Sequence, residues 1–208
     1  MTTINAPPHT SSIDETTIKK VAELKVLDSK KGEVRFGSLF EEQKTVVIFI
    51  RHFFCGSCQA YITQLCNLVS DEALEKAGTR VVLVGSGETE AFDHFREMTG
   101  FKGNIYTNPS RDLFRAFGMT TTTQTTPAGE TRKSYLTSTK TQVVLNSLWD
   151  IAKKPYLFFA KTGNLSQNGG ELILGPGLQC SFASIMQHSE DHTELVDLMR
   201  VAGVQIAS

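Results

Sequence analysis

Hydrophobic positions along this 208-residue chain fall into two patterns: short continuous runs, and runs in which apolar residues recur every three or four positions. Continuous runs rich in valine, isoleucine and phenylalanine are typical of buried strands, and they occur at 45–51, 80–84 and 104–107. Helical spacing predicts helices at about 13–23, 59–69, 90–98, 110–117, 141–152 and 191–201. Strands that alternate with helices favour an α/β fold.

Two predicted hairpins frame this alternating region. Extended runs at 24–28 and 33–36 flank a glycine-containing turn, and a second pair, 169–174 and 178–183, flanks the Gly-Pro-Gly sequence at 175–177. Hairpins add antiparallel strands to a sheet whose other strands are parallel. The sequence therefore predicts an α/β sandwich, with a central mixed sheet flanked by helices.

The composition divides the chain into a tail and one domain. Residues 1–12 are rich in Thr, Ser and Pro and predict a disordered tail, whereas 13–208 forms one domain. With 40% hydrophobic and 21% charged residues, the chain has the composition of an ordinary globular protein. Thr-rich residues at about 119–140 lack apolar periodicity, and we interpret them as a loop inserted into the domain.

Charge and hydropathy narrow the function classes. A formal net charge of −1 gives no general attraction to nucleic acid or to anionic membranes. No apolar stretch approaches the roughly 20 residues of a spanning helix, and the N-terminus lacks the pattern of a secretory signal. Four cysteines are too few for a disulfide scaffold. We expect a cytoplasmic protein with neither nucleic acid nor membrane as a partner.

The candidate chemistry lies at Cys55-Gly56-Ser57-Cys58, between the strand at 45–51 and the helix that follows. A thiolate in the first turn of a helix is stabilised by the unpaired N–H groups and the positive end of the helix dipole. A Cys-x-x-Cys pair in this context indicates a redox-active dithiol. We expect Cys55, nearer the helix start, to attack and Cys58 to resolve the mixed disulfide, although the reverse order remains open.

Two ionisable side chains precede the dithiol. Arg51 and His52 are candidates to lower a thiol pKa or to move a proton. Because successive residues of a strand face opposite sides, we expect that both do not point at the sulfurs.

Other cysteines and histidines have structural interpretations. Cys66 lies eight positions after Cys58, about 12 Å along a helix, which is too far for a disulfide, and we predict a core position for it. His188 is predicted at the surface. Asp191 and His192 are predicted to form the start of the last helix.

The segment Phe49-Ile-Arg-His-Phe-Phe-Cys-Gly-Ser-Cys58 resembles the active-site segment of peroxiredoxin-like proteins in the alkyl hydroperoxide reductase C/thiol-specific antioxidant superfamily. The similar subgroup includes the selenoprotein U-like and prostamide synthase-like proteins. Further stretches fit it, at 97–103, 106–111 and 166–170. The resemblance covers about 13–203 apart from the Thr-rich insertion. It implies a thioredoxin-like fold and a thiol–disulfide oxidoreductase with an antioxidant role, reset by the thioredoxin or glutathione system.

The chain departs from the peroxiredoxin pattern at the groups that bind peroxide. Peroxiredoxins carry Pro-x-x-x-Thr-x-x-Cys. With Cys58 at the peroxidatic position, Arg51 and Cys55 replace that Pro and Thr, and with Cys55 there the pair is also missing. Where the family has an Arg before a late strand, this chain has Gly169-Gly170. We therefore do not expect fast peroxidase activity.

The same two glycines suggest an alternative. Thioredoxins place a cis-proline at the position of Gly169-Gly170, and glycine there would leave room beside the sulfurs. Thioredoxin-like proteins that lose this proline can bind a metal or an iron–sulfur cluster. In this alternative, Cys55 and Cys58 from two subunits of a homodimer supply the four thiolates of a [2Fe–2S] cluster. The leading interpretation needs no metal or cofactor. A third possibility, hinted at by the subgroup, is reduction of a quinone or a prostanoid peroxide.

Overall fold

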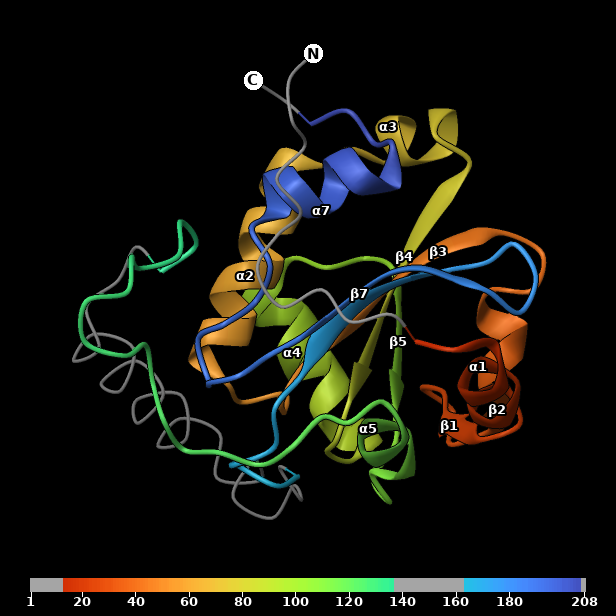
Figure 1. Ribbon diagram of the computed structural model, residues 1–208, viewed down its shortest axis with the longest axis horizontal. Helices are drawn as coiled ribbons and strands as arrows, with labels where there is room; N and C mark the ends of the chain where they lie inside the picture. The colour runs from red at the N-terminus through yellow and green to blue at the C-terminus, as the bar shows by residue number, and fades with distance from the viewer. Residues whose placement is uncertain (1–12, 137–162, 207–208) are drawn as a thin grey trace.

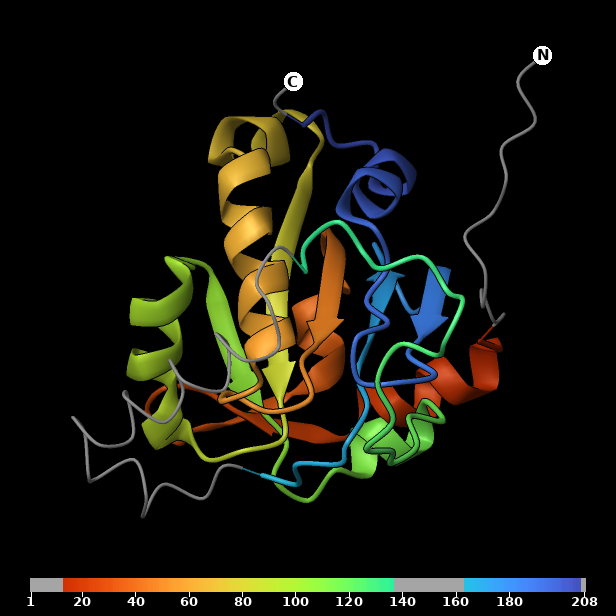
Figure 2. The ribbon, with the colours of Figure 1, turned by 90° about the vertical axis from the view of Figure 1, so that its left-hand side faces the viewer.

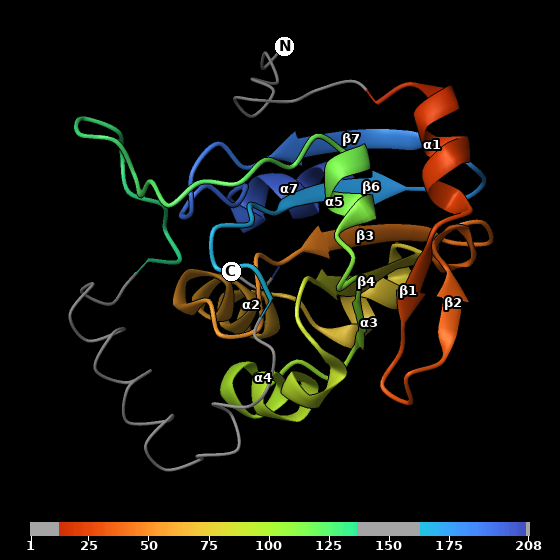
Figure 3. The same cartoon turned by 90° about the horizontal axis from the view of Figure 1, so that it is seen from below.

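A seven-stranded mixed sheet forms the centre of the protein in the computed structural model, which describes residues 13–136 and 163–206 (Figure 1). The strands, in chain order, are β1 Lys25–Leu27, β2 Glu33–Arg35, β3 Lys44–Phe49, β4 Thr79–Gly85, β5 Asn104–Thr107, β6 Gly170–Leu174 and β7 Cys180–Ile185. Their order in the sheet is β2-β1-β5-β4-β3-β6-β7, and Figure 3 shows β7, β6, β3 and β4 side by side.

Strand directions confirm the mixed sheet. β3 pairs in parallel with β4, and β4 in parallel with β5, whereas the hairpin strands join the sheet antiparallel. Because the carboxyl ends of parallel strands meet at one edge, the segments that follow β3, β4 and β5 lie at the same end of the sheet. The dithiol belongs to the first of these segments.

Side chains of β3 alternate between two hydrophobic layers. Val46 and Ile48 face one layer, and Val47 and Phe49 face the other. The first layer is covered by α2 (Gly56–Leu68), α3 (Asp71–Lys76), α4 (Phe92–Thr99) and α7 (Leu195–Ala202). The second is covered by α1 (Glu15–Ala22), the 3₁₀ helix Phe36–Leu39 and α5 (Asp112–Ala116). In Figure 2, α2 lies between α4 and α7.

Most predicted elements are present, with shifted ends. The last helix is a correction: it begins at Leu195 rather than at residue 191, and its N-cap position is held by Glu194. The described part of the Thr-rich segment, 119–136, contains neither helix nor strand and pairs with the chain before β6 through one bridge, Thr121 to Gln167. The predicted helix at 141–152 and the predicted tail at 1–12 lie outside the described residues.

Helix lengths bear on membrane insertion. The longest helix of the described ranges, α2, has 13 residues, and none there is long and apolar enough to cross a bilayer.

Candidate active site

The dithiol sits where the chain turns from β3 into α2. Cys55 holds the N-cap position of α2 with an extended backbone, and Cys58 is the third residue of the helix. Neither cysteine is part of a disulfide. The first N–H groups of α2 have no partner within the helix, so a negative charge on a sulfur at this end is stabilised.

The loop before the dithiol is anchored by an aromatic side chain. Phe53 is fully buried and meets the rings of Phe92 and Phe95 edge-on, with centroids 5.1 and 5.7 Å away. Its ring lies against Gly85 at the end of β4, where an added Cβ would come within 2.4 Å of it. Ser86 adds a hydrogen bond of 2.6 Å from its hydroxyl to the carbonyl of Arg51. The neighbouring strand end therefore fixes where this loop runs.

Cys55 has a cationic and polar neighbourhood. Arg51 Nη1 donates to its Sγ over 3.3 Å, and the Oγ of Ser57 lies 3.1 Å from the same sulfur. A hydrogen bond from the Cys58 thiol, followed by the nearby His52 and Arg51, lowers the pKa of Cys55 well below its ordinary value despite burial. Burial in turn lowers the pKa of His52 itself, so Arg51 is the permanent cation beside this sulfur.

Arg51 also ties two parts of the chain together. Its Nε donates to the carbonyl of Gln167 over 2.9 Å, and Nη2 donates to the carbonyl of Leu165 over 2.7 Å. The expectation that Arg51 and His52 alternate across a strand does not hold, because β3 ends at Phe49 and both residues lie in the loop beyond it. The loop turns the guanidinium towards Cys55 and leaves His52 close enough to influence the charge of that sulfur.

Cys58 is fully buried and has a second set of neighbours. Its Sγ lies 3.3 Å from Nε2 of His192, and Nδ1 of that imidazole lies 2.5 Å from Oε1 of Glu171. The second oxygen of Glu171 accepts a hydrogen bond of 3.1 Å from the backbone N–H of Thr193. Burial, and then the hydrogen bond to Cys55, raise the pKa of Cys58 well above its ordinary value. Cys58 is therefore the protonated thiol of the pair.

The sequence did not predict this arrangement. His192 is fully buried beside Cys58 rather than part of a helix start, and Asp191 pairs with Lys133 over 3.2 Å. His188, predicted at the surface, is 5% exposed. One signal was present in the sequence: Glu171 is the one charged residue in the otherwise apolar strand Gly-Glu-Leu-Ile-Leu, and a carboxylate buried there needs a partner.

Two tyrosines enclose the imidazole. The ring of Tyr61 stacks on His192 at 4.4 Å and 7°, and Tyr135 meets Tyr61 edge-on at 5.0 Å. The hydroxyl of Tyr135 donates to the carbonyl of Glu190 and accepts from the backbone N–H of His192, at 2.6 and 3.1 Å. The end of the Thr-rich segment is thus more than a loop on the surface, because Tyr135 helps to hold His192 in place.

Gly169 and Gly170 have a packing reason. A Cβ on Gly169 would lie 1.9 Å from the carbonyl oxygen of Phe49, and one on Gly170 would lie 2.4 Å from that of Ser184. The atoms nearest these positions belong mainly to the flanking strands, and neither the sulfur of Cys55 nor that of Cys58 is among them. The pair lets β6 approach its neighbours closely, and the suggestion that it opens space at the dithiol gains no support from the geometry.

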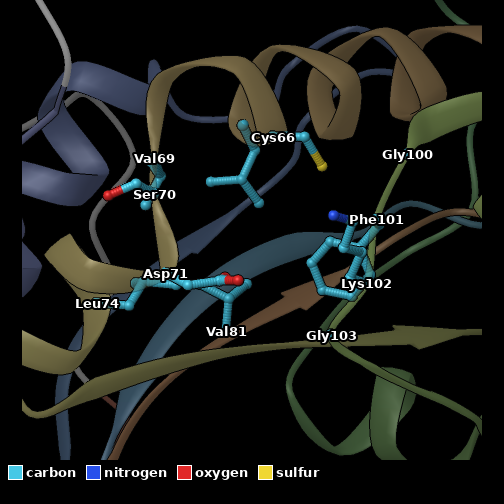
Figure 4. A pocket seen from close by; sticks show the side chains of 11 residues that line it. Cys66, Val69, Ser70, Asp71, Leu74, Val81, Gly100, Phe101, Lys102 and Gly103 are labelled. Atoms are coloured by element: carbon cyan, nitrogen blue, oxygen red, sulfur yellow. The ribbon is translucent and has the colours of Figure 1, made fainter.

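The second cysteine within α2, Cys66, lies away from the dithiol. Cys66 is exposed, so the predicted core position is wrong. It borders a cavity of about 230 Å³ lined by Leu65, Cys66, Val69, Ser70, Asp71, Leu74, Val81 and residues 100–103 (Figure 4). Partial burial and the charge of Asp71 raise the pKa of Cys66. Neither Cys55 nor Cys58 lines this cavity.

The shared iron–sulfur cluster does not fit this site. A cluster bridging two subunits needs both sulfurs at the surface, whereas Cys55 is 4% exposed and Cys58 0%. Among the described residues, Glu130, His188 and Asp191 form a group with ligand-type atoms within 4.8 Å of one another. Its atoms already have partners, because His188 binds Glu130 and Asp191 accepts from Lys133 and from the N–H of Gln187.

The fold and the buried Cys-x-x-Cys pair define a thioredoxin-fold protein of the peroxiredoxin type. Solved peroxiredoxins have the same fold: peroxiredoxin Q of Xanthomonas campestris superposes with a TM-score of 0.53 at 13% identity, over 89% of this chain and 91% of that one. A bacterioferritin comigratory protein of the same organism gives 0.52 at 13% identity, over 89% and 92%.

The sequence comparisons identify the family. The family described as AhpC/TSA antioxidant enzyme matches residues 64–188. Peroxiredoxin-like 2C of Mus musculus is 32% identical over 185 residues, 89% of this chain and 80% of that protein. The prostamide/prostaglandin F synthase of Salmo salar is 26% identical, over 86% and 84%. The chain therefore belongs to the AhpC/TSA family, as its resemblance implied. The family match begins after Cys58, so the chemistry of the dithiol must be argued from its geometry.

Proposed function

We propose that this protein is a thiol–disulfide oxidoreductase in which Cys55 attacks and Cys58 resolves. The observation that carries the proposal is the opposite polarisation of two adjacent sulfurs. Arg51 Nη1 lies 3.3 Å from Cys55 Sγ, whereas Cys58 Sγ lies 3.3 Å from the imidazole of His192, which contacts the carboxyl group of Glu171. The lowered pKa of Cys55 supplies a thiolate nucleophile at neutral pH, and Cys58 stays protonated until the second step.

The reaction has two balanced steps. The Cys55 thiolate attacks one sulfur of a substrate disulfide, forms a mixed disulfide and expels the other sulfur as a thiolate. Cys58, after losing its proton, attacks Cys55 Sγ, closes the Cys55–Cys58 disulfide and releases the second substrate thiol. With a peroxide, Cys55 would become a sulfenic acid as the O–O bond breaks, and ring closure would release water. An external dithiol of the thioredoxin type, or glutathione, would restore both thiols.

Arg51 supports both substrates. A guanidinium has five N–H groups, and three of the nitrogen atoms of Arg51 each make one of the contacts given above. The other two N–H groups of this side chain have no acceptor among the described residues, and we propose that they serve a leaving thiolate or oxygen anion at Cys55. The Pro and Thr of the peroxiredoxin pocket remain absent, so we propose that disulfides are the better substrates and that peroxide reduction is slow.

Differential thiol labelling tests the proposal. Reduced protein is exposed to a small disulfide or to hydrogen peroxide, trapped with a maleimide and mapped by peptide mass. We expect Cys55 and Cys58 to lose the label together and with the mass of one disulfide, before the slower thiols Cys66 and Cys180 lose theirs. Retention of both labels on Cys55 and Cys58 for hours would refute the proposed function.

A further inference from the structure

Within the proposed function, we infer that His192 is the general base for Cys58 and that Glu171 orients it, so that a Cys58–His192–Glu171 relay drives closure of the active-site disulfide. The three groups come from α2, from the segment before α7 and from β6. Antiparallel pairing of β6 with β3 places Glu171 opposite Ile48, near the end of β3 that leads to the dithiol.

The relay geometry assigns the proton on each atom. Oε2 of Glu171 accepts from the N–H of Thr193, and Oε1 lies 2.5 Å from Nδ1 of His192. A carboxylate that only accepts requires the proton on Nδ1. The lone pair of Nε2 then points to the remaining neighbour, Cys58 Sγ, at 3.3 Å. His192 is thus set up to receive the thiol proton, with the Glu171 carboxylate beside the resulting imidazolium.

The orientation of the imidazole is fixed before any reaction. Tyr61 stacks on one ring face at 4.4 Å, and the backbone N–H of His192 donates to Tyr135. His192 and Glu171 are both 0% exposed, so solvent does not compete for these contacts. Preorganised groups of this kind act on the reacting proton with no reorganisation of water.

The state of Cys55 determines when the relay acts. In the reduced protein, the Cys58 thiol donates its hydrogen bond to the Cys55 sulfur. Once Cys55 is bonded to a substrate sulfur, it no longer carries the negative charge that attracts this hydrogen. His192 is then the stronger acceptor at Cys58, and deprotonation follows mixed-disulfide formation.

The proton and electrons balance in this step. Nε2 of His192 takes the proton of Cys58, whose electron pair forms the bond to Cys55 Sγ. The bond between Cys55 and the substrate sulfur breaks, and the substrate leaves as a thiolate. The imidazolium returns the proton to the leaving thiolate or to solvent. The titratable or charged groups of the described residues that face the relay are Cys55, Tyr61, Tyr135, Asp191, Glu194 and Arg51.

Reaction with dithiobis(nitrobenzoate), a chromogenic disulfide, separates the two chemical steps. A Cys66→Ser/Cys180→Ser background removes the exposed and half-buried thiols that would also react. The first chromophore released reports attack by Cys55, and the second reports closure by Cys58. We expect His192→Gln to slow the second phase about 100-fold at neutral pH while the first phase stays within about twofold. Glu171→Gln should slow it about tenfold.

A matched control is available in the same segment. His188 is also buried and bonded to a glutamate, Glu130, but its Nδ1 accepts from the N–H of Glu190 instead of facing a sulfur. His188→Gln should leave the second phase unchanged. Raising the pH should restore the second phase in both relay variants, because hydroxide then ionises Cys58 directly. A merely structural defect would not be repaired by alkali.

The outcomes distinguish failure of the relay from failure of the proposed dithiol function. If the background protein releases one chromophore or none, the proposed dithiol function fails. If the background protein releases two chromophores and the His192→Gln variant has the same second-phase rate, the dithiol function holds and only the relay is wrong. Should His192→Gln not fold, which its circular dichroism spectrum would reveal, the background protein is compared in H₂O and D₂O. A slower second phase in D₂O supports proton transfer, and equal rates contradict it.

Discussion

The side chains around Cys55 differ from those around Cys58, although both sulfurs lie in the first turn of α2. Cys55 lies against the guanidinium of Arg51, from the loop before α2, and the hydroxyl of Ser57, from α2 itself. Cys58 lies against the imidazole of His192, which in turn contacts the carboxyl group of Glu171, and both residues are more than 100 positions away in the chain. The helix end is common to both sulfurs, so it cannot explain why their pKa values move in opposite directions. The difference comes from the hydrogen bond between the two sulfurs, from the burial of Cys58 and from the side chains that the fold packs against Cys55.

The largest expected effect comes from removing each of the two sulfurs in turn by substitution with serine. Cys55→Ser should reduce the rate of reaction with a small disulfide at the site by at least about 1,000-fold, because a serine hydroxyl is not ionised at neutral pH. Cys58→Ser should react through Cys55 and accumulate the mixed disulfide. Intact mass spectrometry distinguishes them: an adduct on Cys58 in the Cys55→Ser variant would reverse the assignment.

A second, smaller effect tests the cation on the Cys55 side. Arg51→Met should slow alkylation of Cys55 about tenfold near neutral pH, because loss of the charge raises the pKa of the Cys55 thiol and lowers its thiolate fraction. The rates should converge in alkali, where both forms are thiolates. Arg96 is a matched control, since its guanidinium also donates to two carbonyls, of Phe101 and Gly103. A tenfold loss in Arg96→Met as well would mean that the effect is structural.

The smallest effect separates the two tyrosines on the Cys58 side. Tyr135→Phe removes two hydrogen bonds and should lower the free energy of unfolding by about 1–3 kcal/mol. The buried hydroxyl of Tyr61 has no partner among the described residues, so Tyr61→Phe should leave stability unchanged or raise it by about 1 kcal/mol. Urea unfolding of both variants checks this. Equal losses would contradict this, because they would mean that the Tyr61 hydroxyl makes a stabilising contact.

Local patterns predicted the strands, the hairpins and the dithiol, because each depends on residues close in sequence. Nearby residues were enough to predict the strand at 45–51, the glycine-containing turns and the position of Cys55 at the start of a helix. The resemblance to the peroxiredoxin-like proteins added the family. Helix ends were less accurate, as the residues before Leu195 are held by contacts with the active site rather than by helical bonds.

The partner of Cys58 could not be predicted from local patterns. Its contact with His192 depends on the antiparallel register of β6 on β3 and on the path of the segment after β7. Neither is encoded by spacing near the cysteines. The core position predicted for Cys66 was wrong for a related reason. Its helical spacing agrees with a core face, but a cavity lies beside it in the folded protein.

The central claim is that Cys55 is the thiolate of this protein at neutral pH, and a brief alkylation pulse tests it most directly. Reduced protein is treated with a limiting amount of iodoacetamide at about pH 6, below the ordinary thiol range, and mapped by peptide mass. Alkylation follows the thiolate fraction, so a lowered pKa keeps Cys55 reactive while the raised pKa values silence Cys58, Cys66 and Cys180. Label on Cys55 alone is the predicted result. Label on Cys58 or Cys66 ahead of Cys55 would contradict the account.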